Sequence, residues 1–203
     1  QHSEMFPLLN QDKDNPLELF QIWINLPKAK KFADPHYIML WAEDIPVRRE
    51  KDPNGKSIEV TVIAGKIGDT IAPPPAPDSW AADPANEVGI WLIKMEKGST
   101  WTLPPAGLGV NRSLYFYRGP DINVAGIDIK PYNAVELLAE QPVIIENGPE
   151  DAYLLMLQGQ PINEPVAQHG PFVMNSMSEI QQAFLDYRRT QFGGWPWPRY
   201  DNV

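Results

Sequence analysis

Short segments in which apolar and polar side chains alternate recur along most of the chain. The strongest covers residues 88–95, and turns containing Gly, Pro or Asn separate it from its neighbours. A period of two is typical of a strand with one buried face. Further segments of this kind lie at residues 59–64, 113–117, 122–124, 127–129, 143–145 and 153–157. Many short strands with hardly a helix between them predict a mostly-β fold, a β-sandwich or a jelly-roll barrel.

One helix is predicted, near the C-terminal end. Ser176 and Glu179 have the spacing of a capping box, in which two side chains satisfy free backbone N–H groups of the first turn. Apolar residues then recur at i, i+3, i+4 and i+7 from Ile180. Two arginines in the last turn and the glycines after it favour the end of a helix there. We expect a short helix at about residues 178–191.

Another strand pattern lies near the N-terminus, at residues 19–26, after a polar turn segment at residues 10–16. An isolated hairpin is marginally stable in water. We therefore expect residues 1–26 to complete a sheet whose other strands come from elsewhere, and a second domain to begin near residue 47.

Two proline-rich segments lie outside these predicted elements. Residues 72–77 are predicted to be a stiff surface spacer rather than a docking peptide. The aromatic residues 195–200 are expected to pack on the domain surface, and a partner-binding peptide is the alternative.

Composition narrows the function classes. The formal net charge is -9, so direct binding to nucleic acid or to an anionic membrane surface is not expected. The chain has no cysteine, which excludes disulfides, thiolate metal sites and a cysteine nucleophile. No apolar run approaches the roughly 18 residues of a transmembrane helix, and a cytoplasmic location is the expectation. Because the first residue is not Met, we expect that the chain has lost an N-terminal segment.

His2 and Glu4 are the candidate metal ligands. In an extended strand, side chains at i and i+2 lie on the same face, so these two could reach one ion together. An imidazole with a carboxylate suits divalent iron, manganese, copper, nickel or zinc. Two ligands are too few for a catalytic site, which normally needs three or four protein groups.

The other two histidines give weaker signals. His36 is interpreted as a surface or hydrogen-bonded histidine, and His169 as a structural residue, with contact to a substrate or neighbouring domain as its alternative. No phosphate-binding loop or nucleophile elbow is present. Residues 97–104 carry Trp101 where a metal-binding cupin usually has a histidine pair, so the second domain is expected to bind no metal.

Several long motifs together resemble the pirin family over essentially the whole chain. They are residues 2–5 (His-Ser-Glu-Met), 19–27 (Leu-Phe-Gln-Ile-Trp-Ile-Asn-Leu-Pro), 158–166 (Gln-Gly-Gln-Pro-Ile-Asn-Glu-Pro-Val) and 168–175 (Gln-His-Gly-Pro-Phe-Val-Met-Asn). Pirins are bicupins, in which the first of two jelly-roll barrels binds one metal ion, typically iron, through three histidines and a glutamate. The resemblance implies that His2 and Glu4 are two of these ligands, and that the other two belong to an H-x-H motif upstream of this chain.

The same resemblance implies a division of the chain. Residues 1–46 would be the remnant of the N-terminal metal-binding cupin, 47–157 the C-terminal metal-free cupin, and 158–203 a tail that crosses back to the first barrel. Pirin relatives are associated with quercetinase-type dioxygenase activity, which implies a small aromatic, flavonol-like substrate and iron or another divalent metal.

Two other hypotheses stay open. The protein could be a non-catalytic binding or regulatory module, like the co-regulators of this family, that works through the second cupin and the aromatic tail. Its partner could be another protein or a complementing N-terminal segment. The isolated chain could also be a stable remnant without activity of its own.

Overall fold

The computed structural model describes residues 8–194, which form two compact units. Residues 32–163 make one of them, here called the β-sandwich unit. The other, the terminal unit, combines residues 1–31 with 164–203, of which 8–31 and 164–194 are described. None of the helices in the described residues has the length and apolarity needed to cross a bilayer.

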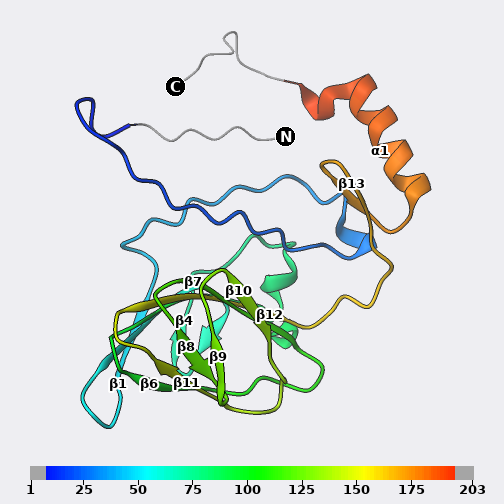
Figure 1. Ribbon diagram of the computed structural model, residues 1–203. Helices are drawn as coiled ribbons and strands as arrows, with labels where there is room; N and C mark the ends of the chain where they lie inside the picture. Colours follow the sequence, from blue (N-terminus) through cyan, green and yellow to red (C-terminus); the bar gives the residue numbers. More distant parts are fainter. Residues whose placement is uncertain (1–7, 195–203) are drawn as a thin grey trace. The chain divides into compact units, whose positions relative to one another are not determined.

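A six-stranded antiparallel sheet is the larger layer of the β-sandwich unit (Figure 1), with the strand order β1-β2-β5-β12-β7-β10. Its strands are β1 (Val47–Lys51), β2 (Ser57–Ala64), β5 (Gly89–Met95), β7 (Asn111–Arg118), β10 (Asn133–Glu136) and β12 (Ala152–Gly159). The turn between β1 and β2 contains Gly55 at φ +78°, a conformation that glycine adopts without steric cost. Neighbours in space are often distant in sequence, as in a jelly roll.

The second layer is a four-stranded antiparallel sheet with the order β6-β11-β8-β9. Its strands are β6 (Thr100–Leu103), β8 (Ile122–Val124), β9 (Ile127–Ile129) and β11 (Val143–Asn147). A small pair, β3 (Lys66–Ile67) with β4 (Thr70–Ile71), and the 3-10 turns η2 (Trp80–Ala82) and η3 (Pro84–Asn86) complete the unit.

The core lies between the two sheets, whose inward side chains form one apolar cluster. Leu114, Ile145, Leu154 and Met156, from both sheets, have no exposed surface. The clean alternation of β7, in which Leu114 and Phe116 face inward and Tyr115 between them faces outward, is the pattern expected for a half-buried strand. The observed fold confirms the predicted mostly-β, cupin-type jelly roll.

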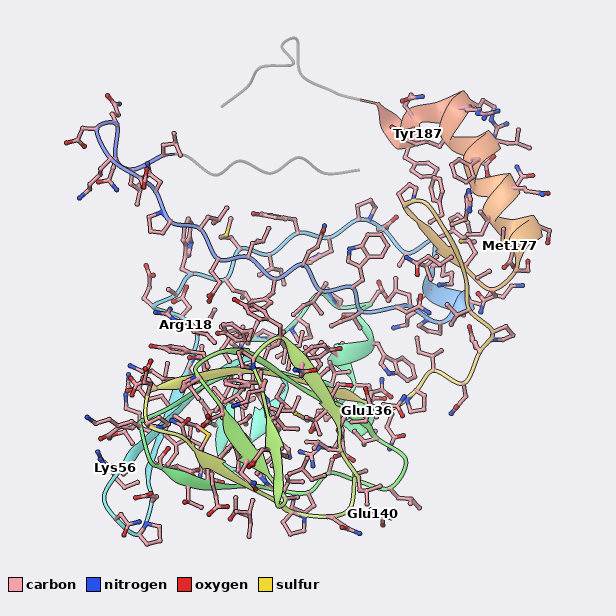
Figure 2. The ribbon with its side chains drawn as sticks, viewed as in Figure 1. Lys56, Arg118, Glu136, Glu140, Met177 and Tyr187 are labelled. Atoms are coloured by element: carbon pink, nitrogen blue, oxygen red, sulfur yellow. The ribbon has the colours of Figure 1, made fainter. Side chains whose placement is uncertain are left out.

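The terminal unit contains a hairpin of β13 (Ala167–His169) with β14 (Phe172–Met174), the helix α1 (Met177–Thr190), and the 3-10 turns η1 (Lys28–Lys30) and η4 (Gln191–Gly193). Ser176 caps α1 by accepting a hydrogen bond from the Glu179 N–H, as the capping box predicts. Tyr187 on α1 lies on the side of the helix that faces the hairpin (Figure 2).

The strand predicted at residues 19–26 is not formed. These residues carry no strand assignment, and Trp23 is 57% exposed. The alternation itself is present, but a strand needs backbone hydrogen bonds to a neighbour, and within the described terminal unit no strand pairs with this segment. The pattern therefore identified an apolar face without a sheet to complete.

Candidate functional site

The predicted metal ligands His2 and Glu4 lie outside the described residues, so their assignment stays a prediction. His36 is exposed in the β-sandwich unit. His169 is exposed on β13, where its ring makes an edge contact with Phe184 at a centroid distance of 5.9 Å. Within residues 8–194 no three His, Asp or Glu side chains come together as metal ligands would.

Apolar side chains occupy the part of β6 where a metal-binding cupin would place histidines. Trp101 is 5% exposed and Leu103 is fully buried, whereas Thr102 between them faces outward. The Trp101 Nε1–H donates to Glu50 Oε2 at 3.0 Å. The indole thus fills the interior with its apolar rings and satisfies its one polar group at the edge, as buried tryptophans usually do.

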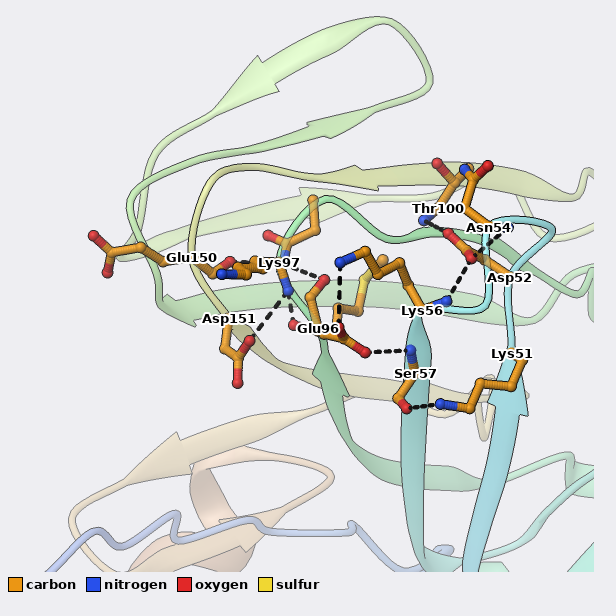
Figure 3. Close-up of polar contacts among 12 residues, drawn as sticks. Lys51, Asp52, Asn54, Lys56, Ser57, Glu96, Lys97, Thr100, Glu150 and Asp151 are labelled. Atoms are coloured by element: carbon orange, nitrogen blue, oxygen red, sulfur yellow. Dashed lines mark hydrogen bonds and ion pairs between the residues drawn. The ribbon is translucent and has the colours of Figure 1, made fainter.

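Asp52 organises a polar network at the turn between β1 and β2 (Figure 3). Its Oδ1 accepts hydrogen bonds from the N–H groups of Asn54 and Lys56, both at 2.8 Å, and its Oδ2 accepts one from Thr100 N–H at 3.1 Å. Burial raises the pKa of Asp52, but the amide hydrogen bonds outweigh burial and hold the pKa below its ordinary value. The carboxylate therefore joins β6 to the turn and is not free to act as a metal ligand.

Glu96 plays a similar structural role beside this turn. It accepts from the Ser57 N–H at 2.8 Å and from Lys56 Nζ at 3.3 Å (Figure 3). The Ser57 N–H, followed by the Lys56 ammonium, lowers the pKa of Glu96. Both acids of this network thus bind backbone, and the network holds the strands rather than a substrate.

Arg112 is the most deeply buried charged side chain among the described residues, at 1% exposure. Its Nε–H donates to Gln158 Oε1 at 3.1 Å and its Nη2 to the Pro104 carbonyl at 2.9 Å. Burial lowers the pKa of the guanidinium, and the nearby charge of Glu87 opposes that change. A buried cation with these partners offers hydrogen-bond donors to an oxygen and repels a metal ion.

Sequence reasoning missed Arg112. The signal was present, because Arg112, Leu114 and Phe116 occupy alternate positions of one strand and share its inward face. An arginine at an inward position of a jelly-roll strand needs hydrogen-bond partners inside the fold. Those partners are Gln158, two strand positions beyond Met156, and a loop carbonyl that no sequence pattern identifies.

A second polar cluster ties the terminal unit together and is here called the Lys28 clamp (Lys28, Glu164, Asn175 and Glu179). Glu164 Oε2 accepts from Lys28 N–H at 2.7 Å and from Asn175 Nδ2 at 2.9 Å. Glu179 pairs with Lys28 Nζ at 2.7 Å and accepts from Asn175 N–H at 2.9 Å. The side-chain hydrogen bond between Lys28 and Glu179 raises the pKa of the lysine and lowers that of the glutamate.

The clamp is a structural junction between segments far apart in the chain. Lys28 comes from η1, Glu164 lies before the hairpin, and Asn175 and Glu179 lie at the start of α1. Apart from the clamp, the terminal unit is held by ring contacts such as the edge contact of Phe172 with Phe184 at 4.8 Å. Neither feature presents a nucleophile or an acid–base pair.

In a comparison with known families, residues 90–193 match the Pirin C-terminal cupin domain. These are 104 residues, just over half of the 203 in the chain. The matched region runs from β5 to η4, so it includes Arg112 but not the core residues of β2.

Similar curated proteins agree with this match. A Vibrio cholerae relative, provisionally named a quercetin 2,3-dioxygenase, is 35% identical over 94% of this chain and 63% of its own length. Human pirin is 31% identical over 89% of this chain and 59% of its own length. The chain thus spans about three fifths of the length of these relatives.

Among solved structures, a quercetin 2,3-dioxygenase from Acinetobacter baumannii is 29% identical, with a TM-score of 0.67. The similarity covers 83% of this chain and 55% of that protein. A second Acinetobacter baumannii structure of the same name has a TM-score of 0.68 at 20% identity, which supports the fold alone.

Proposed function

The chain belongs to the pirin family, and from this we propose that it is part of a metal-dependent dioxygenase of the quercetinase type. The observation that carries the proposal is the similarity to proteins named quercetin 2,3-dioxygenase, which extends over 94% of the chain in the Vibrio cholerae relative. Because the chain spans less than two thirds of that relative, the activity is assigned to a longer protein that contains it.

His2 and Glu4 are the residues of this chain that would hold the metal. A neutral imidazole and a carboxylate, two positions apart in the sequence, are a donor pair that suits iron(II) or a similar divalent ion. Two further histidines, from an H-x-H motif that the resemblance places upstream, would complete four ligands. When bound, the ion would supply the chemistry by which dioxygen reacts with a small, flavonol-like aromatic substrate.

Beyond residues 1–46, which carry His2 and Glu4, the segments of the chain would support this site without binding metal themselves. In this proposal residues 1–46 contribute to the first cupin, 47–157 form the metal-free second cupin, and 158–203 return to the first. Arg112 supports the middle assignment, because a second cation placed beside a buried guanidinium would be repelled. The apolar filling around Trp101 and Leu103 favours the same assignment.

Metal analysis and a quercetin oxidation assay test the proposal, each on this chain and on a version extended at its N-terminus by the pirin H-x-H region. We expect about one metal ion per chain and oxidation of quercetin only for the extended version. In that version His2→Ala and Glu4→Gln should each remove metal and activity. His169→Ala is the matched control, since His169 is an exposed histidine of the terminal unit. Equal activity of the short and extended versions would contradict the role of His2 and Glu4.

Exposed aromatic residues favour a second candidate, a non-catalytic module that binds a protein segment. In the stretch of the β-sandwich unit that precedes β1, Tyr37 is 77% exposed and Trp41 is 59% exposed. Large exposed apolar side chains of this kind are typical of a docking surface. The partner we propose is the complementing first-cupin segment. Trp41→Ser should weaken its binding in a pull-down with that segment, and unchanged binding would remove this candidate.

A further inference from the structure

Three buried polar side-chain groups of the β-sandwich unit have no hydrogen-bond partner: the hydroxyl of Ser99 and two N–H donors. The indole Nε1–H of Trp91, a residue that is 3% exposed, makes no hydrogen bond, and neither does Nη1 of Arg112, which is 1% exposed. Buried N–H groups are nearly always paired in folded proteins, because the hydrogen bonds to water lost on burial must be replaced. The guanidinium also makes no ion pair among the described residues.

Strand register brings the two donors to the same place. Gln158 of β12 is opposite Gly89 of β5 on one side and opposite Arg112 of β7 on the other. Gly89 has no side chain, and the Trp91 ring lies over it: a Cβ at Gly89 would be 3.2 Å from the ring carbon Cε2 that carries Nε1, and 2.9 Å from Gln158 Cγ. Both donors therefore lie around the side chain of Gln158.

The carboxylate of Glu87, whose charge acts on Arg112, does not accept a hydrogen bond from either of these two donors. Glu87 Oε2 already accepts from the Gly107 N–H at 3.0 Å, and its carboxylate lies directly against that glycine, where a Cβ would be 2.1 Å from Oε1. The Glu87 carbonyl in turn accepts from Gln158 Nε2 at 3.3 Å. Glu87 thus closes one side of the place but leaves Nη1 of Arg112 free.

We propose that the Trp91–Arg112 site binds a small planar monoanion, such as a carboxylate or nitrate. Such an anion has two or more acceptor oxygens in one plane, which could take hydrogen bonds from the indole and from Nη1 at once, and its charge would offset that of the buried guanidinium. The neighbouring inward residues Leu114 and Met156 are fully buried, so the ligand can have only a few atoms. This site does not depend on the proposed dioxygenase function.

The direct test uses the indole N–H of Trp91 as the reporter. The 203-residue chain is labelled with [15N]tryptophan and titrated with sodium formate or sodium nitrate, and the ionic strength is held constant with sodium sulfate. We expect the Trp91 indole signal, assigned by its loss in Trp91→Phe, to move and reach saturation while those of the other tryptophans do not. A response to formate alone would assign a carboxylate, and a response to both would assign planar monoanions generally.

Paired variants separate this site from a general salt effect, with melting temperature as the readout. Formate should raise the melting temperature of the native chain, and Trp91→Phe should weaken the apparent affinity by at least about tenfold, since it removes one hydrogen bond to a charged ligand. Trp101→Phe is the matched control, because the Trp101 indole already donates to Glu50, and it should keep the native response. A Trp91 signal that does not saturate with either anion, or equal responses in the two variants, would overturn the proposal in favour of bound water.

Discussion

Different interactions stabilise the β-sandwich unit and the terminal unit, each within itself. In the first, side chains from two sheets form one core in which residues such as Phe116 and Ile145 are at most 1% exposed. In the second, α1 buries only Ile180 and Ala183, and segments distant in sequence meet at the charged groups of the Lys28 clamp. The free energy of apolar burial does not depend on pH, whereas the stabilisation by a clamp of ionised groups does. The two units should therefore respond differently to substitution. Acid should act on the terminal unit through the clamp and on the β-sandwich unit through Asp52 and Glu96, whose pKa values are also lowered.

The largest effect is expected in the core, where two adjacent isoleucines of β11 face opposite ways. Ile145 has no exposed surface and Ile144 is 52% exposed. Ile145→Ala should lower the free energy of unfolding by about 2–5 kcal/mol, because it removes buried methyl groups and leaves a cavity. Ile144→Ala should lower it by less than about 1 kcal/mol, the range of β-propensity. Urea unfolding followed by tryptophan fluorescence measures both.

This pair is its own control, since the two residues share strand, type and substitution. Similar shifts of the urea midpoint in the two variants would mean that the β-sandwich unit does not derive its stability from the interior between its sheets.

A smaller effect is expected at the start of α1. Ser176→Ala removes the side-chain oxygen that accepts from the Glu179 N–H, and loss of such a cap costs about 1 kcal/mol. Hydrogen exchange of the amides in the first turn of α1 should therefore become about fivefold faster. Gln181→Ala, on the exposed face of the same helix, is the matched control and should leave exchange nearly unchanged. If Ser176→Ala also left it unchanged, α1 would be held by its ring contacts alone.

The units also differ in how far the sequence predicts them. Strands such as β7 and β11 were predictable because one face of each is buried, so that their alternation reports the core directly. β1 and β10, which contain no fully buried residue, were not predicted. Alternation at residues 19–26 predicted a strand that is not formed, since pairing depends on a neighbour that a pattern cannot supply. The α1 cap was predictable from four adjacent residues, but the Lys28 clamp was not, because Lys28 and Glu164 meet only in the fold.

For the candidate sites the same distinction holds. The alternation of β7 could have placed Arg112 on the inward face. That Arg112 lies near Trp91 could not be predicted, because it depends on the register of three strands and on the absence of a side chain at Gly89. His2 and Glu4 carry a local signal, the i, i+2 spacing, and lie outside the described residues. Their role remains a prediction that only the metal assay tests.

The smallest effect concerns pH and the Lys28 clamp. The hydrogen bond from Lys28 holds the pKa of Glu179 below the ordinary value of 4.5. A group with a lowered folded-state pKa stabilises the fold above its unfolded pKa, and that contribution is lost as the pH falls through the folded value. Conversely, the raised pKa of Lys28 means that its contribution is present below 10.5 and is lost at higher pH. The terminal unit should thus loosen below pH 4.5 and again above 10.5.

Hydrogen exchange at the Asn175 amide, which donates to Glu179, measures this loosening at the clamp itself. In Glu179→Gln the loss of protection against exchange below pH 4.5 should disappear, because no carboxylate remains there to protonate. At neutral pH the exchange rate of this variant should rise by less than about tenfold, since both partners of the ion pair are solvent-accessible. Glu150→Gln is a matched control in the β-sandwich unit, where Glu150 is exposed, and should retain the native profile. An unchanged acid response in Glu179→Gln would locate the pH sensitivity in the other carboxylates, such as Glu164, and would leave the clamp a geometric rather than an electrostatic junction.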